Sequence, residues 1–241
     1  IGDIKLPCNT PLFTFMVSLL LLIFNFALEY INLIVPIISL FIPKIDYRFG
    51  VYFVTGRQGS GKTYFAIYLA LQQIGYDIKT HKIKSNGEFK IVTNIRSLKV
   101  DSVPVYYFSK VSDIYLSTDE YCLFVIDELA RKYDKLSKTD TQFYAFLNQC
   151  RKMHRVCIMI TQEWKELPMW IRRPAKYCIT TQPVRFLNRF GIYKTVVGDA
   201  ENMELDKDSM EWTCPPLKYI YYKRNLDVAK MYDTFEAINE L

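Results

Sequence analysis

The chain has 241 residues, of which 50% are hydrophobic and 15% aromatic, and it carries a formal net charge of +6. This composition excludes a largely disordered chain, because it offers ample apolar surface for a core. The 6 cysteines include no Cys-x-x-Cys pair and there are only 2 histidines, so the sequence disfavours a zinc site and a disulfide scaffold and favours reduced core cysteines.

The first element in chain order is an apolar run from Leu12 to Ile42, in which Glu29 is the only charged residue. About 20 apolar residues suffice for a helix to cross a bilayer, so Leu12 to Leu28 and the next turn predict one transmembrane helix. The shorter part after Glu29 is broken at Pro36, and an interfacial helix, a re-entrant segment and a second span all fit it. A cleaved signal peptide and a buried helix of the folded domain are the alternatives to an anchor.

A phosphate-binding loop follows directly. The apolar strand expected at 50–55 runs into Gly56-Arg-Gln-Gly-Ser-Gly-Lys-Thr63, which matches G-x-x-x-x-G-K-[ST] in full. Its glycines let successive N–H groups point at a phosphate, with the positive end of the next helix behind them. Lys62 is expected to bridge the β- and γ-phosphates of ATP, and Thr63 to ligate Mg²⁺. The residues expected to contact ATP are Gly56, Arg57, Gln58, Gly59, Ser60, Gly61, Lys62, Thr63 and Tyr64.

A second buried strand, at 121–126, ends in Asp127 and Glu128. Its apolar run predicts a strand covered on both faces of a parallel sheet. Asp127 is expected to hold Mg²⁺ through water, and Glu128 to polarise the attacking water. A third such strand, at 156–161, ends in Gln162, which is expected to sense the γ-phosphate. The pattern predicts an α/β P-loop NTPase of the additional-strand (RecA/FtsK-like) class, with a parallel sheet flanked by helices.

Basic residues concentrate in the middle of the chain. From Arg131 to Lys194 there are fourteen Lys or Arg against four Asp or Glu, whereas from Asp199 onward there are five against ten. Arg151 and Arg155 stand near the end of the helix expected at 140–154, where they are candidate arginine fingers for a neighbouring subunit or solvated helix-end charges. Aromatic and basic residues interleave from Tyr177 to Lys194, a pattern that suits single-stranded DNA, although strand alternation produces the same pattern.

Several of these segments together resemble a known family. GRQGSGKT, Val92-Thr-Asn-Ile95, LFVIDE, the arginine-containing helix leading into Ile158-Met-Ile-Thr-Gln162, and Trp170-Ile-Arg-Arg173 are similar to the zonula occludens toxin-like (Zot) family. That family includes morphogenesis ATPases of filamentous phages, and the resemblance covers roughly Val51 to Val184. It implies an inner-membrane ATPase that drives extrusion of a phage and its single-stranded DNA.

The resulting hypothesis divides the chain into an N-terminal membrane anchor, 1–46, and a P-loop ATPase domain, 47–241, with an acidic extension from about Asp199. It places a single-pass protein in the host inner membrane with the ATPase domain in the cytoplasm, where ATP is found. The expected partners are further copies of the chain in a ring, the inner membrane, phage coat and assembly proteins, and single-stranded DNA.

Two alternatives stay open. The apolar run precedes the P-loop here, whereas filamentous-phage members carry theirs after the ATPase domain, so a viral genome-packaging or conjugative DNA-translocating ATPase also fits. A membrane-tethered nucleotide-binding scaffold or toxin-like effector that does not hydrolyse ATP is the alternative of a different class.

Overall fold

The structure is a computed structural model, and it divides into two units, Ile1–Ile45 and Asp46–Leu241. The residues that it describes are Leu19 in the first unit and 49–83, 89–115, 121–134, 136–184, 190–207 and 211–233 in the second. The predicted anchor at 1–46 therefore lies, apart from Leu19, outside the described residues.

The described residues include eight strands in one sheet, in the order β12-β9-β8-β1-β7-β6-β4-β5. Six neighbouring strands, from β8 to β5, run parallel, and β9 and β12 extend the β8 edge with antiparallel pairing. The main strands are β1 (Gly50–Thr55), β4 (Lys90–Thr93), β5 (Val105–Tyr107), β6 (Cys122–Ile126), β7 (Val156–Ile160), β8 (Ala175–Pro183), β9 (Ile192–Asp199) and β12 (Pro216–Lys223).

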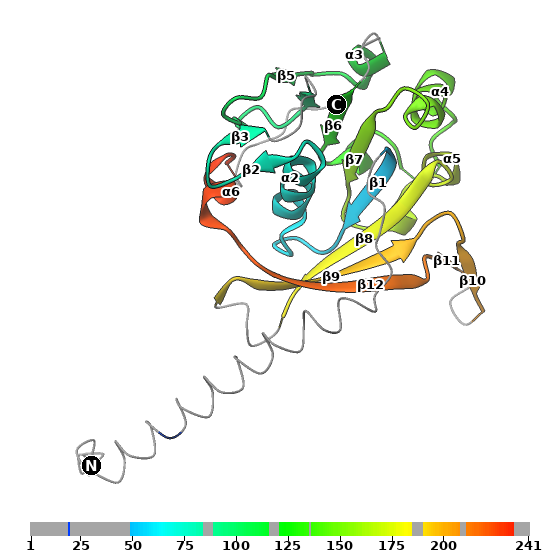
Figure 1. Cartoon of the computed structure of the whole chain (residues 1–241). Helices are drawn as coiled ribbons and strands as arrows, with labels where there is room; N and C mark the ends of the chain where they lie inside the picture. Colours follow the sequence, from blue (N-terminus) through cyan, green and yellow to red (C-terminus); the bar gives the residue numbers. More distant parts are fainter. Residues whose placement is uncertain are drawn as a thin grey trace, which may run out of the picture. The chain divides into compact units, whose positions relative to one another are not determined.

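The position of β7 between β1 and β6 is the additional-strand arrangement. The strand that leads into the phosphate loop and the strand that ends in Asp127 are therefore not neighbours. The predicted α/β fold with a mostly parallel sheet is confirmed, and Figure 1 shows the strands with helices on both sides.

Helices cover the two faces of the sheet. The helices are α2 (Lys62–Gln73), α3 (Val111–Tyr115), α4 (Thr141–Gln149), α5 (Met169–Arg172) and α6 (Leu226–Lys230), with 3-10 turns η1 (Leu129–Arg131) and η2 (Trp164–Glu166). Alternate residues of β1, Val51 and Phe53, pack with Phe143 and Phe146 of α4 in one buried cluster. The intervening Tyr52 and Val54 are equally buried, on the face that α2 covers, because successive strand residues point to opposite faces.

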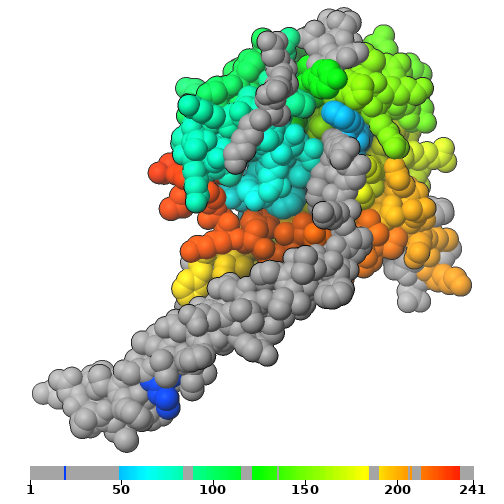
Figure 2. Space-filling view, in the orientation of Figure 1, coloured from blue at the N-terminus to red at the C-terminus, as the bar shows by residue number. Residues whose placement is uncertain are grey.

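Short pairs of strands stand outside the main sheet. They are β2 (Tyr76–Asp77) with β3 (Lys82–Ile83), and β10 (Glu204–Asp206) with β11 (Glu211–Thr213). The strand β12 lies beside α2, where the Tyr222 ring stacks on Tyr64, and its orange atoms are visible on the surface in Figure 2.

The prediction of a single-pass inner-membrane protein is wrong for this structure. In the described ranges no helix combines the length and the apolar character that a bilayer crossing requires. The longest helix there, α2, has 12 residues, and at 1.5 Å per residue such a helix falls well short of a hydrocarbon core about 30 Å thick.

The helix expected at 140–154 also ends earlier than predicted. Asp140 caps α4 as expected, because its carboxylate accepts a hydrogen bond from the Phe143 N–H at 3.0 Å. The helix ends at Gln149, however, and a turn precedes β7. This difference moves the arginines that follow the helix.

Candidate nucleotide site at the carboxyl end of the sheet

The phosphate loop joins β1 to α2 and is held at both of its ends. The Gly56 N–H donates to the Gln162 carbonyl at 3.1 Å, and the Ser60 N–H donates to the Arg57 carbonyl at 3.1 Å. The buried Ser60 hydroxyl lies 3.2 Å from the hydroxyl of Thr181 on β8. Arg57 is exposed at the tip of the loop together with Gln58 and Gly59, so the loop has a fixed base and an open rim.

Glycine is required at two positions of this loop. Gly56 has φ +145°, and a Cβ there would collide with the Thr181 carbonyl and the Ser60 hydroxyl. Gly61 has φ +83° and immediately precedes α2. These conformations are costly for other residues, and they let the backbone approach a phosphate at the N-terminus of α2.

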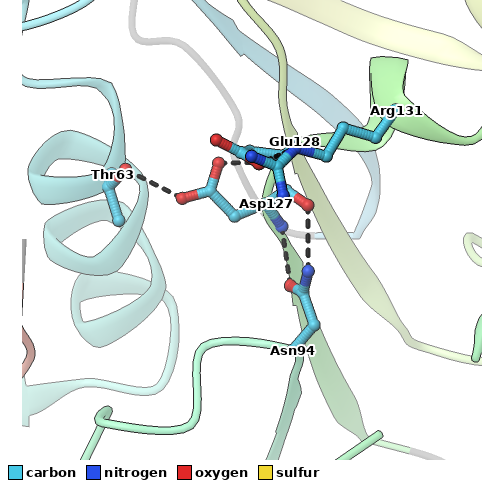
Figure 3. A network of polar contacts seen from close by, with 5 residues as sticks. All are labelled: Thr63, Asn94, Asp127, Glu128 and Arg131. Carbon is cyan, nitrogen blue, oxygen red and sulfur yellow. Dashed lines mark hydrogen bonds and ion pairs between the residues drawn. The ribbon is translucent and has the colours of Figure 1, made fainter. Parts of the chain in front are cut away.

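Lys62 and Thr63 follow at the start of α2. The Lys62 ammonium donates to the Arg57 carbonyl at 3.0 Å and therefore lies across the loop. The Thr63 hydroxyl donates to a carboxylate oxygen of Asp127 at 2.9 Å. The phosphate loop and the acid-bearing strand, which are 64 residues apart in sequence, thus meet at one point (Figure 3).

Asp127 is buried and its backbone is clamped by Asn94, which follows β4. The Asn94 side-chain carbonyl accepts from the Asp127 N–H at 2.8 Å, and the Asn94 amide donates to the Asp127 carbonyl at 2.9 Å. The other carboxylate oxygen of Asp127 accepts from the Glu128 N–H at 2.8 Å. Every polar group of the Asp127 peptide and side chain that faces this site therefore has a partner, as Figure 3 shows.

Burial shifts both ionisable groups of this site toward their neutral forms. Desolvation raises the pKa of Asp127 above its ordinary value, although the hydrogen bonds from Thr63 and the Glu128 N–H oppose the shift. Desolvation likewise lowers the pKa of Lys62, and the nearby carboxylates of Asp127 and Glu128 oppose that shift. Such opposed shifts at one place are typical of functional sites.

Glu128 has a left-handed backbone, with φ 55°, at the start of η1. Its carboxylate forms an ion pair with the Arg131 guanidinium, three residues later, at the edge of the network in Figure 3. Both side chains are partly exposed, at 36% for Glu128 and 52% for Arg131. Glu128 is thus next to the Asp127 carboxylate but tied to a cation.

Gln162 lies at the phosphate loop, as its expected role requires. Its backbone carbonyl accepts the hydrogen bond from the Gly56 N–H. Gln162 also lines a cavity of about 340 Å³, together with Thr55, Arg57, Trp164 and Thr180. The Gln162 side chain is exposed.

Tyr64, by contrast, is directed away from the loop, because its hydroxyl accepts a hydrogen bond from the Asn225 N–H at 2.8 Å and its ring stacks on Tyr222.

The structure does not bring Arg151 and Arg155 to this site within one chain. Arg155 directly precedes β7, level with Gly50 at the amino end of the parallel strands, while the phosphate loop follows their carboxyl ends. Its side chain is 4% exposed, with the guanidinium 5.7 Å from the centre of the Phe146 ring. Arg151 is exposed in the turn before it.

Two functional features were missed from the sequence. Asn94 lies in the family-like segment Val92–Ile95, but its position beside the acid strand depends on the strand order, which the sequence does not reveal. Arg131 had no signal, because its pairing with Glu128 depends on the tight turn of η1. The stretch 185–189 within the aromatic and basic segment lies outside the described residues.

The donors of the site suit Mg²⁺. Thr63 and Asp127 present hard oxygen atoms, and Mg²⁺ commonly takes one or two protein oxygens and completes its shell with water and substrate phosphates. Within the described ranges no group of three or more His, Cys, Asp or Glu side chains forms an all-protein metal cage. Such a pair of oxygen donors would suit a Mg²⁺ ion that binds together with a nucleotide.

The fold and the site together define a P-loop NTPase of the additional-strand arrangement. Among solved structures, the N-terminal domain of zonular occludens toxin from Neisseria meningitidis matches with a TM-score of 0.53 at 18% identity, over 77% of this chain and 100% of that one. The resemblance to the Zot family is therefore confirmed at the level of the fold.

Two further solved structures are similar at a lower level. The genome packaging NTPase B204 from Sulfolobus turreted icosahedral virus 2, in complex with ATP-gammaS, has a TM-score of 0.45 at 15% identity, over 72% of this chain and 100% of that one. The flagellar accessory protein FlaH from Methanocaldococcus jannaschii has a TM-score of 0.43 at 13% identity, over 72% of this chain and 84% of that one. Comparisons with family models and with curated proteins find no match.

Proposed function

We propose that the chain is an ATP-hydrolysing motor that serves phage assembly and the extrusion of phage particles containing single-stranded DNA. The observation that carries the ATPase proposal is the 2.9 Å hydrogen bond between Thr63 and Asp127, because it joins the phosphate loop to the acid strand where Mg²⁺ and the γ-phosphate would lie. The fold shared with the zonular occludens toxin domain supports the assignment to phage assembly.

Each residue has a distinct part in this reaction. The loop N–H groups and Lys62 bind the phosphates, and Thr63 and Asp127 would hold Mg²⁺, which would supply positive charge beside the phosphates. The Asn94 clamp fixes the direction of the Asp127 carboxylate. Glu128 orients the attacking water, for which its carboxylate must leave Arg131. Gln162, beside Gly56, is the candidate sensor of the γ-phosphate.

The decisive experiment measures ATP turnover by the full chain with Mg²⁺. Lys62→Ala should lose phosphate binding and turnover together, whereas Glu128→Gln should bind ATP with affinity close to that of the unchanged protein and lose turnover by a factor of about 100 or more. Lys79→Ala, an exposed lysine outside the site, is the matched control. Turnover by the unchanged protein equal to that of Glu128→Gln would favour the non-hydrolysing scaffold instead.

A ring of identical subunits is part of the proposal, with Arg151 as the finger candidate whose side chain is exposed. Sedimentation of the protein with and without ATP tests for the ring.

The alternative motors, a genome-packaging or conjugative ATPase, predict that double-stranded DNA stimulates turnover. Stimulation by double-stranded DNA and not by single strands would replace extrusion with packaging.

A further inference from the structure

One face of the antiparallel edge of the sheet is uncovered and chemically distinctive. Tyr219 and Tyr221 of β12 are 52% and 63% exposed, which is high for aromatic side chains in the middle of a strand. The register places Tyr219 opposite Val196 and Tyr221 opposite Lys194 of β9. We call this surface, formed by the outward residues of β8, β9 and β12, the open face.

The open face is positive. Lys194 lies with its ammonium 4.6 Å above the centre of the Tyr219 ring, and Lys223 continues the face one pair beyond Tyr221. The structure describes all residues of β8, β9 and β12, and Asp199 is the single carboxylate among them. Asp199 pairs with Tyr177, and because side chains alternate along a strand, both lie on the face opposite to Lys194 and Val196. The open face thus combines exposed aromatic rings with lysines and has no carboxylate from these strands. Aromatic rings can stack on the bases of a nucleic acid, and lysines can contact its phosphates.

The other face of the same strands touches the phosphate loop. Tyr193 and Tyr222 are the alternate residues, paired across β9 and β12 with ring centres 5.7 Å apart. A Cβ placed on Gly61 would lie 3.2 Å from a carbon of the Tyr193 ring and 3.6 Å from the Tyr222 hydroxyl. The open face and the loop residue before Lys62 are therefore separated by one layer of sheet.

A second path joins the open face to the loop. Thr180 and Val196, which pair across β8 and β9 on this face, line the cavity of about 340 Å³ that also includes Gly56, Arg57 and Gln162. A ligand that lies along the open face thus reaches the rim of the nucleotide site without crossing the sheet.

We propose that the open face binds a single-stranded nucleic acid, with Tyr219 and Tyr221 stacking on bases and Lys194 and Lys223 contacting phosphates. Single strands fit better than a duplex because only unpaired bases offer their faces to tyrosine rings. The contacts of Tyr193 and Tyr222 with Gly61 then connect occupancy of the open face to the phosphate loop. This connection, unlike the binding itself, rests on the proposed ATPase function.

Fluorescence anisotropy of labelled oligothymidylate with the full chain tests the binding. Tyr219→Leu and Tyr221→Leu should each weaken the affinity about tenfold. The matched control is Tyr106→Leu, since Tyr106 is 52% exposed on β5 at the opposite edge of the same sheet. Lys194→Gln should weaken binding and reduce the slope of log affinity against log salt by about 0.7, whereas Lys110→Gln should leave the slope unchanged. Oligouridylate in parallel distinguishes DNA from RNA as the ligand.

The inference is overturned if oligothymidylate does not bind, or if Tyr221→Leu and Tyr106→Leu bind it equally. It is also overturned if Tyr221→Leu changes the sedimentation of the protein while oligonucleotide binding is absent, because the open face is then an interface between copies of the chain. Lys194→Gln keeps the test valid if the tyrosine variants fail to fold.

The two proposals fail separately. Anisotropy needs no hydrolysis, so binding without turnover contradicts only the ATPase, and turnover without binding contradicts only the open face. Where both hold, oligothymidylate should stimulate turnover, and Tyr221→Leu should raise the oligonucleotide concentration for half-maximal stimulation about tenfold with the basal rate unchanged. Stimulation that is the same in Tyr221→Leu would contradict the assignment.

Discussion

The two ends of the parallel strands β1, β4, β6 and β7 carry different kinds of side chain. At the carboxyl end, the residues that follow the strands are Gly56, Asn94, Asp127 and Thr161, and they are polar or lack a side chain. Asn94, Asp127 and Thr161 are all buried, and the hydrogen bonds of the Asn94 clamp hold two of these segments together.

At the amino end of these strands lie the buried Arg155, directly before β7, and a cluster of partly or largely exposed aromatic rings. Phe49 and His154 have ring centres 5.0 Å apart, Tyr121 stacks on His154 at 5.3 Å, and Phe89 meets Tyr121 at 6.0 Å. This end gains stability from apolar and aromatic contacts. The carboxyl end buries the Asp127 carboxyl group, and desolvation raises its pKa. One sheet thus has a stabilising end and a functional end, and substitutions at the two ends should separate stability from turnover.

The largest effect is expected for Asn94→Ala at the carboxyl end. It leaves the N–H and the carbonyl of Asp127 buried without their partner, which should lower the free energy of unfolding by about 2–4 kcal/mol. Because the Asp127 carboxylate also loses its orientation, turnover should fall at least tenfold. Urea unfolding and an ATPase assay at a temperature where the variant is folded measure the two effects.

The control for this prediction is Asn148→Ala. Asn148 is exposed, and its amide donates to the Tyr144 carbonyl at 2.9 Å. Its removal should change stability by less than about 0.5 kcal/mol. If Asn94→Ala behaves like this control, the clamp does not hold the acid strand.

Arg155→Met tests the opposite end. The buried guanidinium is replaced by an apolar chain, so the free energy of unfolding should fall by about 1–3 kcal/mol, while turnover per folded molecule should stay within twofold. Arg151→Met, at an exposed position, is the control for stability. A loss of turnover of 100-fold or more for Arg155→Met, with unchanged stability, would restore Arg155 as an arginine finger acting on a neighbouring subunit.

This contrast shows what the sequence can predict. The strands at 50–55, 122–126 and 156–160 were predictable, because each is an apolar run that ends in a polar residue. In a parallel sheet all such ends meet at one edge, so Lys62, Asp127 and Gln162 could be placed together without coordinates. The arginines were harder to place, because a residue before a strand and a residue after it are close in sequence but lie at opposite ends of the sheet.

The antiparallel edge illustrates the other limit. Ile192 to Val197 alternate between partly exposed and buried positions, yet β9 was not predicted, since its pairing with β8 and β12 is decided by contacts distant in sequence. Asn94 was missed for a similar reason, because only the strand order shows that β4 lies beside β6. Local pattern predicts elements, and the partner of each polar group follows from the topology.

Asp127→Asn should show that the functional end reduces stability. The folded-state pKa of Asp127 is raised by burial, so the folded protein binds a proton that the unfolded chain has already released. This group therefore destabilises the fold as pH rises from its ordinary value, about 3.9, through its raised value. Near neutral pH, Asp127→Asn should therefore melt at a higher temperature than the unchanged protein, with turnover abolished.

The gain should shrink as the pH is lowered toward about 4, where the unfolded carboxyl also takes up its proton. Glu201→Gln, an exposed acid, is the control and should leave the melting temperature unchanged at both pH values. A lower melting temperature for Asp127→Asn at neutral pH would mean that the charged carboxylate stabilises the fold through Thr63.

The smallest effect is expected for Arg131→Gln, at the rim of the functional end. The Glu128–Arg131 pair is partly exposed, so its loss should change the free energy of unfolding by less than about 1 kcal/mol. If Glu128 has to leave Arg131 to orient water, the same small energy limits the gain in turnover to between about two- and fivefold. Steady-state kcat for Arg131→Gln, compared with that of the exposed control Lys79→Ala, measures this gain. A lower kcat would instead show that Arg131 supports Glu128 during the reaction, which would make the ion pair part of the working geometry rather than a restraint on it.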